Sequence, residues 1–282
     1  MTTHAFRIVP RGAFSWPAAF SVLTRFPPLG HVWAGTERDV KLSLLADGDF
    51  APVDVHLRFA GGALHGVVSD ASRTQVVENQ IARIFSLDHD GKDWDAIPIT
   101  RIIPGLRPVC FASPYEAACW AIVSQRVSKQ QAARVVRSLV DKHGHFPTPT
   151  ELRRVRVVRG LASIKLDRLH AVATAALDGV LGADRLRALG DDDGPASLRR
   201  IPGIGPFWSS GIYLRACGIK DVFPDEPLSI AALARVHRLE ASPSRAVISE
   251  ITDRFRPFRM WACFLLRVAD ARGLLDSASF AA

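Results

Sequence analysis

The hydrophobic positions in the first part of the chain follow a strand-like pattern. Short runs rich in Val, Leu and aromatic residues are separated by Gly, Asp and Pro, which is typical of β-strands. These runs are residues 31–36 (HVWAGT), 40–46 (VKLSLLA), 53–59 (VDVHLRF) and 64–70 (LHGVVSD). Residues 14–26 and 76–85 instead place apolar side chains at helical spacing. We therefore expect a small α+β domain over residues 1–104, with an antiparallel sheet and helices on one face.

From Pro114 onward the pattern becomes helical. Residues 113–144 form a long amphipathic stretch with cap signals at both ends. A break at residues 125–128 is expected to divide this stretch into two helices, with Ser128 as the cap of the second. Further helices are expected over residues 148–160, 165–179, 196–201, 206–218, 228–239 and 244–273, with an acidic loop over residues 190–197. The pattern predicts an all-α domain over residues 105–282.

Composition and charge add a class of partner. The 282 residues carry 36 Lys and Arg against 28 Asp and Glu, a formal net charge of +8. Such a balance favours a polyanionic partner such as nucleic acid. Residues 126–168 alone contain eleven Lys and Arg against three acids, which predicts salt-dependent contacts with phosphates. The apolar share of 48% is normal for a globular chain with a sizeable core.

The cysteines and the apolar runs exclude several classes of protein. Cys110, Cys119, Cys217 and Cys263 lie far apart without a C-x-x-C pair, so neither a zinc site nor a disulfide framework is indicated. They are typical of small buried residues in a reducing compartment. The apolar run over residues 260–266 is too short to span a bilayer, and the N-terminal residues lack an apolar signal core. We therefore expect a cytoplasmic protein without a membrane partner.

The motif with the clearest chemical meaning is PGIGP, residues 202–206. It joins a helix that ends at Ile201 to one that begins directly after Gly205, which predicts a helix–hairpin–helix. Gly203 and Gly205 permit a positive φ and the close approach of another backbone, and Ile204 is expected to anchor the hairpin in the core. Amides at the start of the second helix then point outward, where the helix dipole favours an anion. A DNA phosphate fits this position; the alternative is an ordinary Pro-Gly turn.

From Gly105 onward the chain resembles the helix–hairpin–helix DNA glycosylase superfamily, and over nearly its full length it resembles the DNA-3-methyladenine glycosylase II (AlkA-type) branch. The patterns that match in order are residues 105–128, 146–155 and 164–181, the hairpin, Arg215, and residues 220–228. The resemblance implies a β-rich N-terminal domain followed by a helical bundle, which agrees with the change of pattern near residue 105. It also implies that a monomer without a metal or other cofactor removes alkylated purines from double-stranded DNA.

The catalytic residue implied by the resemblance is an aspartate roughly two helical turns and a loop past the hairpin, after a Phe-Pro-type turn. Residues 223–226 read Phe-Pro-Asp-Glu, but the usual spacing from Gly205 falls on Pro227. A two-residue deletion gives the role to Asp225 and a one-residue deletion gives it to Glu226. The residue type favours Asp225. The alternative is that Asp225 only caps the following helix.

The residues after the hairpin indicate the type of reaction and the base pocket. Bifunctional relatives place a lysine two residues after the second hairpin glycine, because a Schiff base at the sugar carbon requires an amine. This chain has Phe207 there, so the resemblance implies a monofunctional enzyme that leaves an abasic site. Phe207 also corresponds by spacing to an aromatic residue of the relatives' base pocket. Trp208, Trp120 and Trp261 are further candidates, although aromatic residues at helical spacing more often belong to the core.

Three further residues are expected to contact DNA. The family has a wedge residue after the Gln of an Ile-Leu-Gly-Gln loop; the matching stretch, residues 122–125, ends at Gln125 and puts Arg126 in the wedge position. The usual wedge is apolar, but an arginine can also enter a minor groove. Lys165 falls where relatives keep a lysine in a second loop near DNA. Two alternative functions stay open: DNA binding without catalysis, and excision of oxidised or deaminated bases by the same fold.

Overall fold

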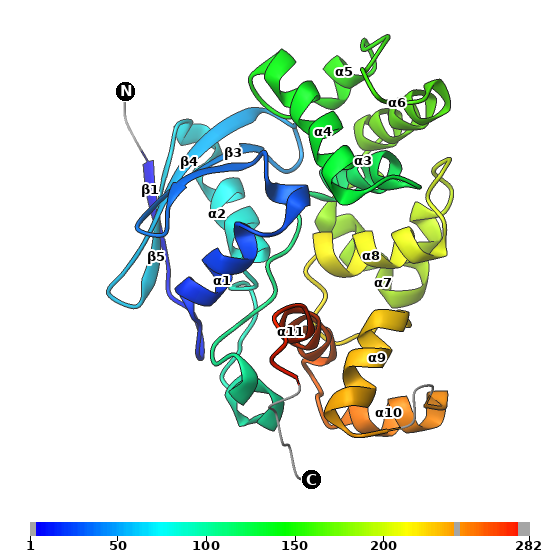
Figure 1. The fold of residues 1–282 in the computed structure, drawn as a ribbon. Coiled ribbons are helices and arrows are strands. Elements are labelled where there is room, and N and C mark those ends of the chain that lie inside the picture. The colour runs from blue at the N-terminus through cyan, green and yellow to red at the C-terminus, as the bar shows by residue number, and fades with distance from the viewer. Residues whose placement is uncertain (1–3, 240–242, 276–282) are drawn as a thin grey trace.

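The structure, a computed structural model, describes residues 4–239 and 243–275 (Figure 1). It begins with a five-stranded antiparallel sheet in the order β1-β5-β4-β3-β2. The strands are β1 (His4–Ile8), β2 (Trp33–Thr36), β3 (Asp39–Leu45), β4 (Pro52–Ala60) and β5 (Ala63–Val68). The hydrophobic runs predicted β2 to β5 but not β1. This edge strand is short, and its partner β5 lies much later in the chain. The hydrophobic pattern of its own residues is therefore too weak to predict a strand.

Alternating burial along the strands determines which face of the sheet carries the core. In β4, Val53, Val55 and Leu57 are buried while the residues between them are exposed. The same hydrophobic cluster contains apolar residues of α1 (Trp16–Leu23) and α2 (Thr74–Ile84), which lie against the sheet in Figure 1. An α+β N-terminal region with an antiparallel sheet is therefore confirmed.

From Pro114 onward the described chain is helical, as expected, while residues 85–113 contain only two short 3-10 helices, Trp94–Ala96 and Pro98–Ile102. The helices are α3 (Pro114–Ser124), α4 (Lys129–His143), α5 (Pro149–Leu152), α6 (Ser163–Leu177), α7 (Ala183–Leu198), α8 (Pro206–Ala216), α9 (Pro227–Val236), α10 (Arg245–Asp253) and α11 (Arg259–Ala271). The predicted break between α3 and α4 is present. Ser128 caps α4 in a capping box, in which its hydroxyl accepts from the Gln131 amide and the Gln131 side chain accepts from the Ser128 amide.

Two expected helices are corrected. The helix expected over residues 148–160 is the single turn α5, and the turns that follow it still bury Val155 and Val158. The helix expected over residues 244–273 is divided into α10 and α11. Pro257 lies between them, and proline can neither donate a backbone hydrogen bond nor continue a helix.

The acidic loop expected over residues 190–197 was also wrong. This segment belongs to α7, with a kink at Gly190, where φ is 82°. The hydroxyl of Tyr213 donates to Oδ1 of Asp191 at 2.9 Å, and a Cβ on Gly194 would lie 2.5 Å from the Tyr213 ring. Contacts with α8 therefore keep an acidic, glycine-containing segment helical.

The buried apolar residues form two clusters that do not follow chain order. The first cluster combines the sheet, α1 and α2 with residues of α9, α10 and α11. The second is formed mainly by α3 to α8. The boundary proposed after residue 104 remains a prediction based on secondary-structure class, since the beginning and the end of the chain share one core.

The four cysteines are buried, as expected, and each is a free thiol in the structure. Within residues 4–239 and 243–275, no helix has the length and apolar character needed to cross a membrane. Over the same residues, no group of three or more His, Cys, Asp or Glu side chains is arranged to hold a metal ion.

Candidate active site beside the helix–hairpin–helix

The predicted hairpin is present between α7 and α8, although α7 ends at Leu198 and not at Ile201. Gly203 has a φ of 89°, and a Cβ there would lie 2.6 Å from Cδ of Arg168. Ile204 is buried in the second cluster, which anchors the turn. Gly205 is the N-cap of α8 in an extended conformation rather than at positive φ, and a Cβ there would meet nothing within 4 Å. The N-terminus of α8 is thus open to an approaching group, and its first turn contains no acidic residue.

The loop between α3 and α4 is bound to this hairpin by a small hydrogen-bond network. Nε2 of Gln125 donates to the Gly203 carbonyl at 2.8 Å, and Nη1 of Arg168 donates to Oε1 of Gln125 at 3.1 Å. Nζ of Lys165 donates to the carbonyls of Val123 at 2.8 Å and Gln125 at 2.6 Å. Burial, followed by the charge of Arg168, lowers the pKa of Lys165. Gln125 and Lys165 therefore hold the loop in place.

Arg126 is the residue that this network presents to solvent. It is exposed and has a φ of 55°, a left-handed conformation that is unusual for a residue other than glycine. Such a conformation persists where the surroundings fix it. The contacts of Gln125 on one side and the Ser128 cap on the other provide that constraint.

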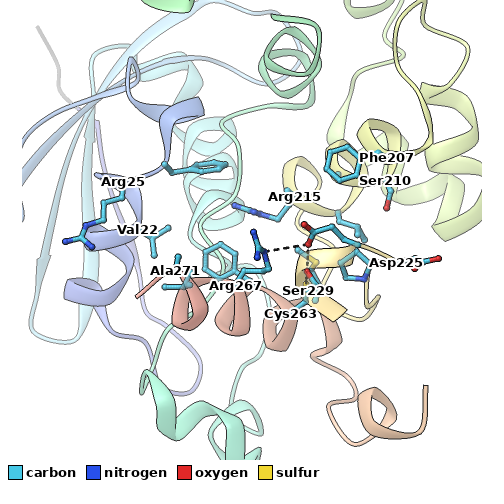
Figure 2. Close-up of a pocket in the computed structure, with 18 of the residues that line it drawn as sticks. Val22, Arg25, Phe207, Ser210, Arg215, Asp225, Ser229, Cys263, Arg267 and Ala271 are labelled. Carbon is cyan, nitrogen blue, oxygen red and sulfur yellow. Dashed lines mark hydrogen bonds and ion pairs between the residues drawn. The ribbon is translucent and has the colours of Figure 1, made fainter. Parts of the chain in front are cut away.

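A pocket of about 700 Å³ lies next to the hairpin (Figure 2). Its wall is formed by α1, one side of α8 from Pro206 to Arg215, the turn at residues 224–226 and α11. Phe207, which is 60% exposed, borders the pocket from the start of α8. The pocket therefore lies between the two hydrophobic clusters, directly beside the open N-terminus of α8.

The two neighbouring acids have different surroundings. Asp225 is 70% exposed, and its Oδ2 is 2.9 Å from Nη2 of Arg245; Figure 2 shows it directed away from Arg215 and Arg267. Glu226 is 22% exposed, and its Oε2 is 3.7 Å from Nε of Arg267 inside the pocket. Glu226, not Asp225, is the N-cap of α9, so the alternative that Asp225 caps this helix is wrong. The geometry favours Glu226 over Asp225, which the residue type had favoured.

The carboxylate of Glu226 is held by two residues that the sequence did not single out. The buried hydroxyl of Ser229 donates a hydrogen bond to Oε2 of Glu226. The thiol of Cys263 in turn donates to Oγ of Ser229 at 3.1 Å. Burial raises the pKa of Cys263 to about 12, so this thiol keeps its proton. The spacing of Glu226 and Ser229, at the N-cap and third position of one helix, is the signal that could have found this pair.

Two arginines form a second feature of the pocket. The guanidinium of Arg215 lies between two rings, 4.9 Å from the centroid of Phe26 and 4.7 Å from that of Phe264. Its Nη2 donates to the Val109 carbonyl at 2.7 Å, and burial lowers its pKa. Arg267 is 31% exposed and projects from α11. No local pattern marked Arg267, because its place in the pocket depends on how α11 packs.

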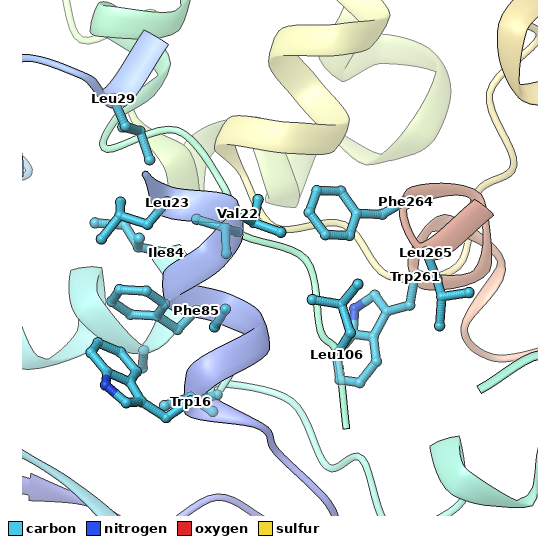
Figure 3. Packing of buried hydrophobic residues seen from close by; sticks show 14 of the residues in the cluster. Trp16, Val22, Leu23, Leu29, Ile84, Phe85, Leu106, Trp261, Phe264 and Leu265 are labelled. Atoms are coloured by element: carbon cyan, nitrogen blue, oxygen red, sulfur yellow. The ribbon is translucent and has the colours of Figure 1, made fainter. Parts of the chain in front are cut away.

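The aromatic residues that were expected in the base pocket lie in different places in the structure. Trp208 and Trp120 border a smaller adjoining hollow of about 220 Å³, which Phe207 also lines. Trp261 is 1% exposed and lies in the first cluster near Leu106 (Figure 3). Trp261 is therefore a core residue and not a wall of the pocket. With 3.6 residues per helical turn, Trp261 and Cys263 point to different sides of α11, and Cys263 is the one that borders the pocket.

Comparison with curated proteins gives two informative matches, although no protein-family model matches the chain. The chain is 22% identical over 182 residues to the DNA-3-methyladenine glycosylase of Bacillus subtilis, covering 57% of this chain and 59% of that protein. It is 25% identical over 221 residues to a probable bifunctional transcriptional activator/DNA repair enzyme AlkA of Mycobacterium tuberculosis, covering 70% and 43%. The chain thus spans about half the length of these relatives.

Solved structures match over most of the chain. A 3-methyladenine DNA glycosylase from Archaeoglobus fulgidus aligns with a TM-score of 0.72 at 19% identity, covering 94% of this chain and 98% of that one. The apo 8-oxoguanine glycosylase/lyase of Clostridium acetobutylicum aligns with a TM-score of 0.63 at 16% identity, covering 94% and 95%. At these identities the likeness establishes the fold. The chain therefore has the fold of these solved glycosylases, and its sequence is similar to those of the two curated relatives.

Proposed function

We propose that the protein is a monofunctional DNA N-glycosylase that removes alkylated purines from double-stranded DNA and leaves an abasic site. The observation that carries this proposal is the carboxylate of Glu226, which a buried hydroxyl holds in a pocket beside an open helix N-terminus. The names of the curated relatives support alkylated purines as the substrate class.

The hairpin is the proposed binding site for the DNA backbone. A phosphate at the N-terminus of α8 would meet free amides and the positive end of the helix dipole. Gly205 leaves room for that phosphate, because no protein atom lies near the position of its missing side chain. We propose Arg126 as the wedge that fills the space left by the flipped base, since it is exposed on a loop that Gln125 and Lys165 hold against the hairpin.

The proposed mechanism of base release follows from the charge of the leaving base. Flipping costs a few kcal/mol, after which the damaged base enters the pocket. A purine alkylated on a ring nitrogen is cationic and leaves as a neutral base, so the barrier lies in the oxocarbenium-like sugar. A preorganised carboxylate beside that sugar supplies ~3–4 kcal/mol and orients the attacking water. Glu226 takes this role here, and its hydrogen bond from Ser229 fixes a side chain one methylene longer than the family's aspartate.

The absence of strand cleavage is part of the proposal. Phe207 stands where a lyase would carry its lysine, but Lys129, at the start of α4, also borders the pocket. We expect no covalent protein–DNA product when the reaction is run with sodium borohydride, because Phe207 provides no amine to form a Schiff base. A trapped product that disappears in Lys129→Met would show that Lys129 supplies the amine and that the enzyme is bifunctional.

The direct test is base release from a methylated duplex, measured by chromatography under single-turnover conditions. Glu226→Gln is expected to slow release by a factor of about 10²–10³. Asp225→Asn is the matched control, and we expect a nearly normal rate because the Asp225 carboxylate is 70% exposed and pairs with Arg245. Equal rates for Glu226→Gln and the unmodified protein would contradict the role of Glu226. Tight DNA binding without any base release would favour the non-catalytic alternative.

A further inference from the structure

The stretch of chain between α1 and β2 forms part of the pocket wall and carries a single polar side chain. Phe26 borders both the larger pocket and the smaller hollow, and Pro27 and Pro28 line the smaller one. Residues 26–32, here called the wall segment, read Phe-Pro-Pro-Leu-Gly-His-Val. His31 is therefore the one residue of the wall segment whose side chain can form a hydrogen bond.

His31 contacts Glu116, the third residue of α3. Nε2 of His31 lies 3.2 Å from Oε2 of Glu116, and the two side chains are only 6% and 5% exposed. The imidazole also packs against Phe146, with 5.2 Å between the ring centroids. Leu29 and Val32 belong to the first hydrophobic cluster, whereas Phe146 belongs to the second. The contact therefore crosses the boundary between the two clusters, where the pocket lies.

The carboxylate of Glu116 serves this contact instead of a capping box. Ser113 and Glu116 have the spacing of such a box, and the Ser113 hydroxyl accepts from the Glu116 amide. In α4 and α5 the side chain of the third residue also accepts from the N-cap amide. In α3, whose residues are all described, Glu116 forms no such bond. Its side chain is directed to the wall segment, away from the partner that its own helix offers.

The strength of this contact depends on the proton of the imidazole. Nδ1 of His31 and Oε1 of Glu116 are buried and have no hydrogen-bond partner among the described residues. A buried carboxylate that accepts one hydrogen bond from a neutral imidazole is poorly stabilised, whereas an imidazolium forms an ion pair with it. Glu116 also lies in the first turn of α3, where the helix dipole favours a negative charge. We therefore expect the contact to strengthen when His31 is protonated.

The other titratable groups around this contact have different partners or stay uncharged. On the surrounding elements they are Tyr115, Cys119, Lys129, His143, His145 and Glu151. Burial raises the pKa of Tyr115 and of Cys119 well above the usual values, so both keep their protons. Nδ1 of His143 and Nε2 of His145 each lie 3.8 Å from Oε1 of Glu151. The imidazole of the wall segment is thus the titratable group in contact with the α3 carboxylate.

We infer that His31 is a positioning residue of the glycosylase, and that its proton-dependent contact with Glu116 holds the wall segment in the arrangement that releases the base. The inference rests on the proposed function. Phe26 transmits the effect, because its ring lies 4.9 Å from the guanidinium of Arg215 and 5.1 Å from the ring of Phe111. A shift of the wall segment therefore changes the surroundings of a flipped base.

The pH dependence of base release tests this inference. Single-turnover release from a methylated duplex is measured from about pH 5.5 to 8, at a temperature where every variant is folded. The decisive quantity is the rate of the unmodified protein divided by that of His31→Gln, because any change in Glu226 affects both rates alike. Glutamine keeps an N–H donor but takes up no proton. We expect this ratio to be close to unity at the upper end of the range and to rise to about 10 at the lower end.

Two further variants separate this contact from general effects on the fold. Glu116→Gln removes the charge that the imidazolium would pair with, so it should show the same change of pH profile as His31→Gln. The double variant should be no slower than either single one. His145→Gln is the matched control, because His145 lies beside Phe146 but next to Glu151, and it should keep the unmodified pH profile.

Each outcome separates the inference from the proposed function. A ratio that stays constant with pH would show that His31 only fills space, which overturns the inference and leaves the function intact. Losses that add in the double variant would overturn it as well, because His31 would then act without Glu116. No base release by the unmodified protein at any pH would refute the glycosylase function itself, and the positioning role with it.

Discussion

Ser229 offers a sharp test of how the pocket holds its carboxylate. Its hydroxyl donates to Oε2 of Glu226 and accepts from the thiol of Cys263. Ser229→Ala removes one oxygen from a fully buried position and leaves the charge of the pocket unchanged. A hydrogen bond to a charged group contributes ~1.5–3 kcal/mol. If the whole of that contribution acts in the transition state, base release slows by about 10- to 150-fold.

The assay is single-turnover base release from a methylated duplex, with DNA affinity measured separately by fluorescence anisotropy. We expect the rate of Ser229→Ala to fall while its affinity for DNA stays unchanged, because Ser229 is fully buried and its side chain offers no surface to the DNA backbone. Cys263→Ala is the matched control: it removes only a weak S–H donor to Ser229 and should have a small effect.

A double variant decides whether Ser229 acts through Glu226. In Glu226→Gln the carboxylate is gone, so the additional change Ser229→Ala should cost little further activity. A normal rate for Ser229→Ala alone, or two losses that simply add in the double variant, would refute the positioning role.

The remaining predictions concern the hairpin, the loop and the thiols. Gly203→Ala should lower the free energy of unfolding by about 1–3 kcal/mol, because its φ of 89° strains any other residue. Gly205→Ala should keep its stability but bind DNA more weakly; equal thermal midpoints for the two would contradict this. Lys165→Met should slow base release more than it weakens DNA binding, because two hydrogen bonds to the loop are lost; equal losses in the two assays would show otherwise. Burial raises the pKa of Cys217 and Cys263 from 9.0 to about 12. The unfolded state loses these protons first, so the free energy of unfolding should fall as pH rises from 9 toward 12. A denaturant midpoint that stays constant over that range would refute the prediction.

The parts of the fold that local patterns predicted are those that local chemistry controls. The alternation in β4, the cap at Ser128 and the two glycines of the hairpin each act within a few residues of chain. The errors lie where distant contacts decide. Tyr213 keeps the acidic segment of α7 helical, and β5 creates a strand from residues whose own pattern is weak.

The candidate site shows the same division. The acidic turn could be found from sequence, but which of its two acids is the less exposed one, held by Ser229, depends on the direction in which α9 leaves the turn. Residue type favoured Asp225, whereas Ser229 and Arg267 hold Glu226. The place of Arg267 beside Glu226 could not be predicted from sequence, because no local sequence pattern connects α11 with a turn some forty residues earlier in the chain. Trp261 was misplaced because a helical residue can face either side until its neighbours are known.

The helix α1 supplies Val22 to the pocket wall, while the hairpin lies on the opposite cluster. Substitutions along α1 can therefore change the shape of this pocket without altering the amides at the N-terminus of α8. On the proposed function, the choice of base and the contact with the DNA backbone are then governed by separate segments of the chain.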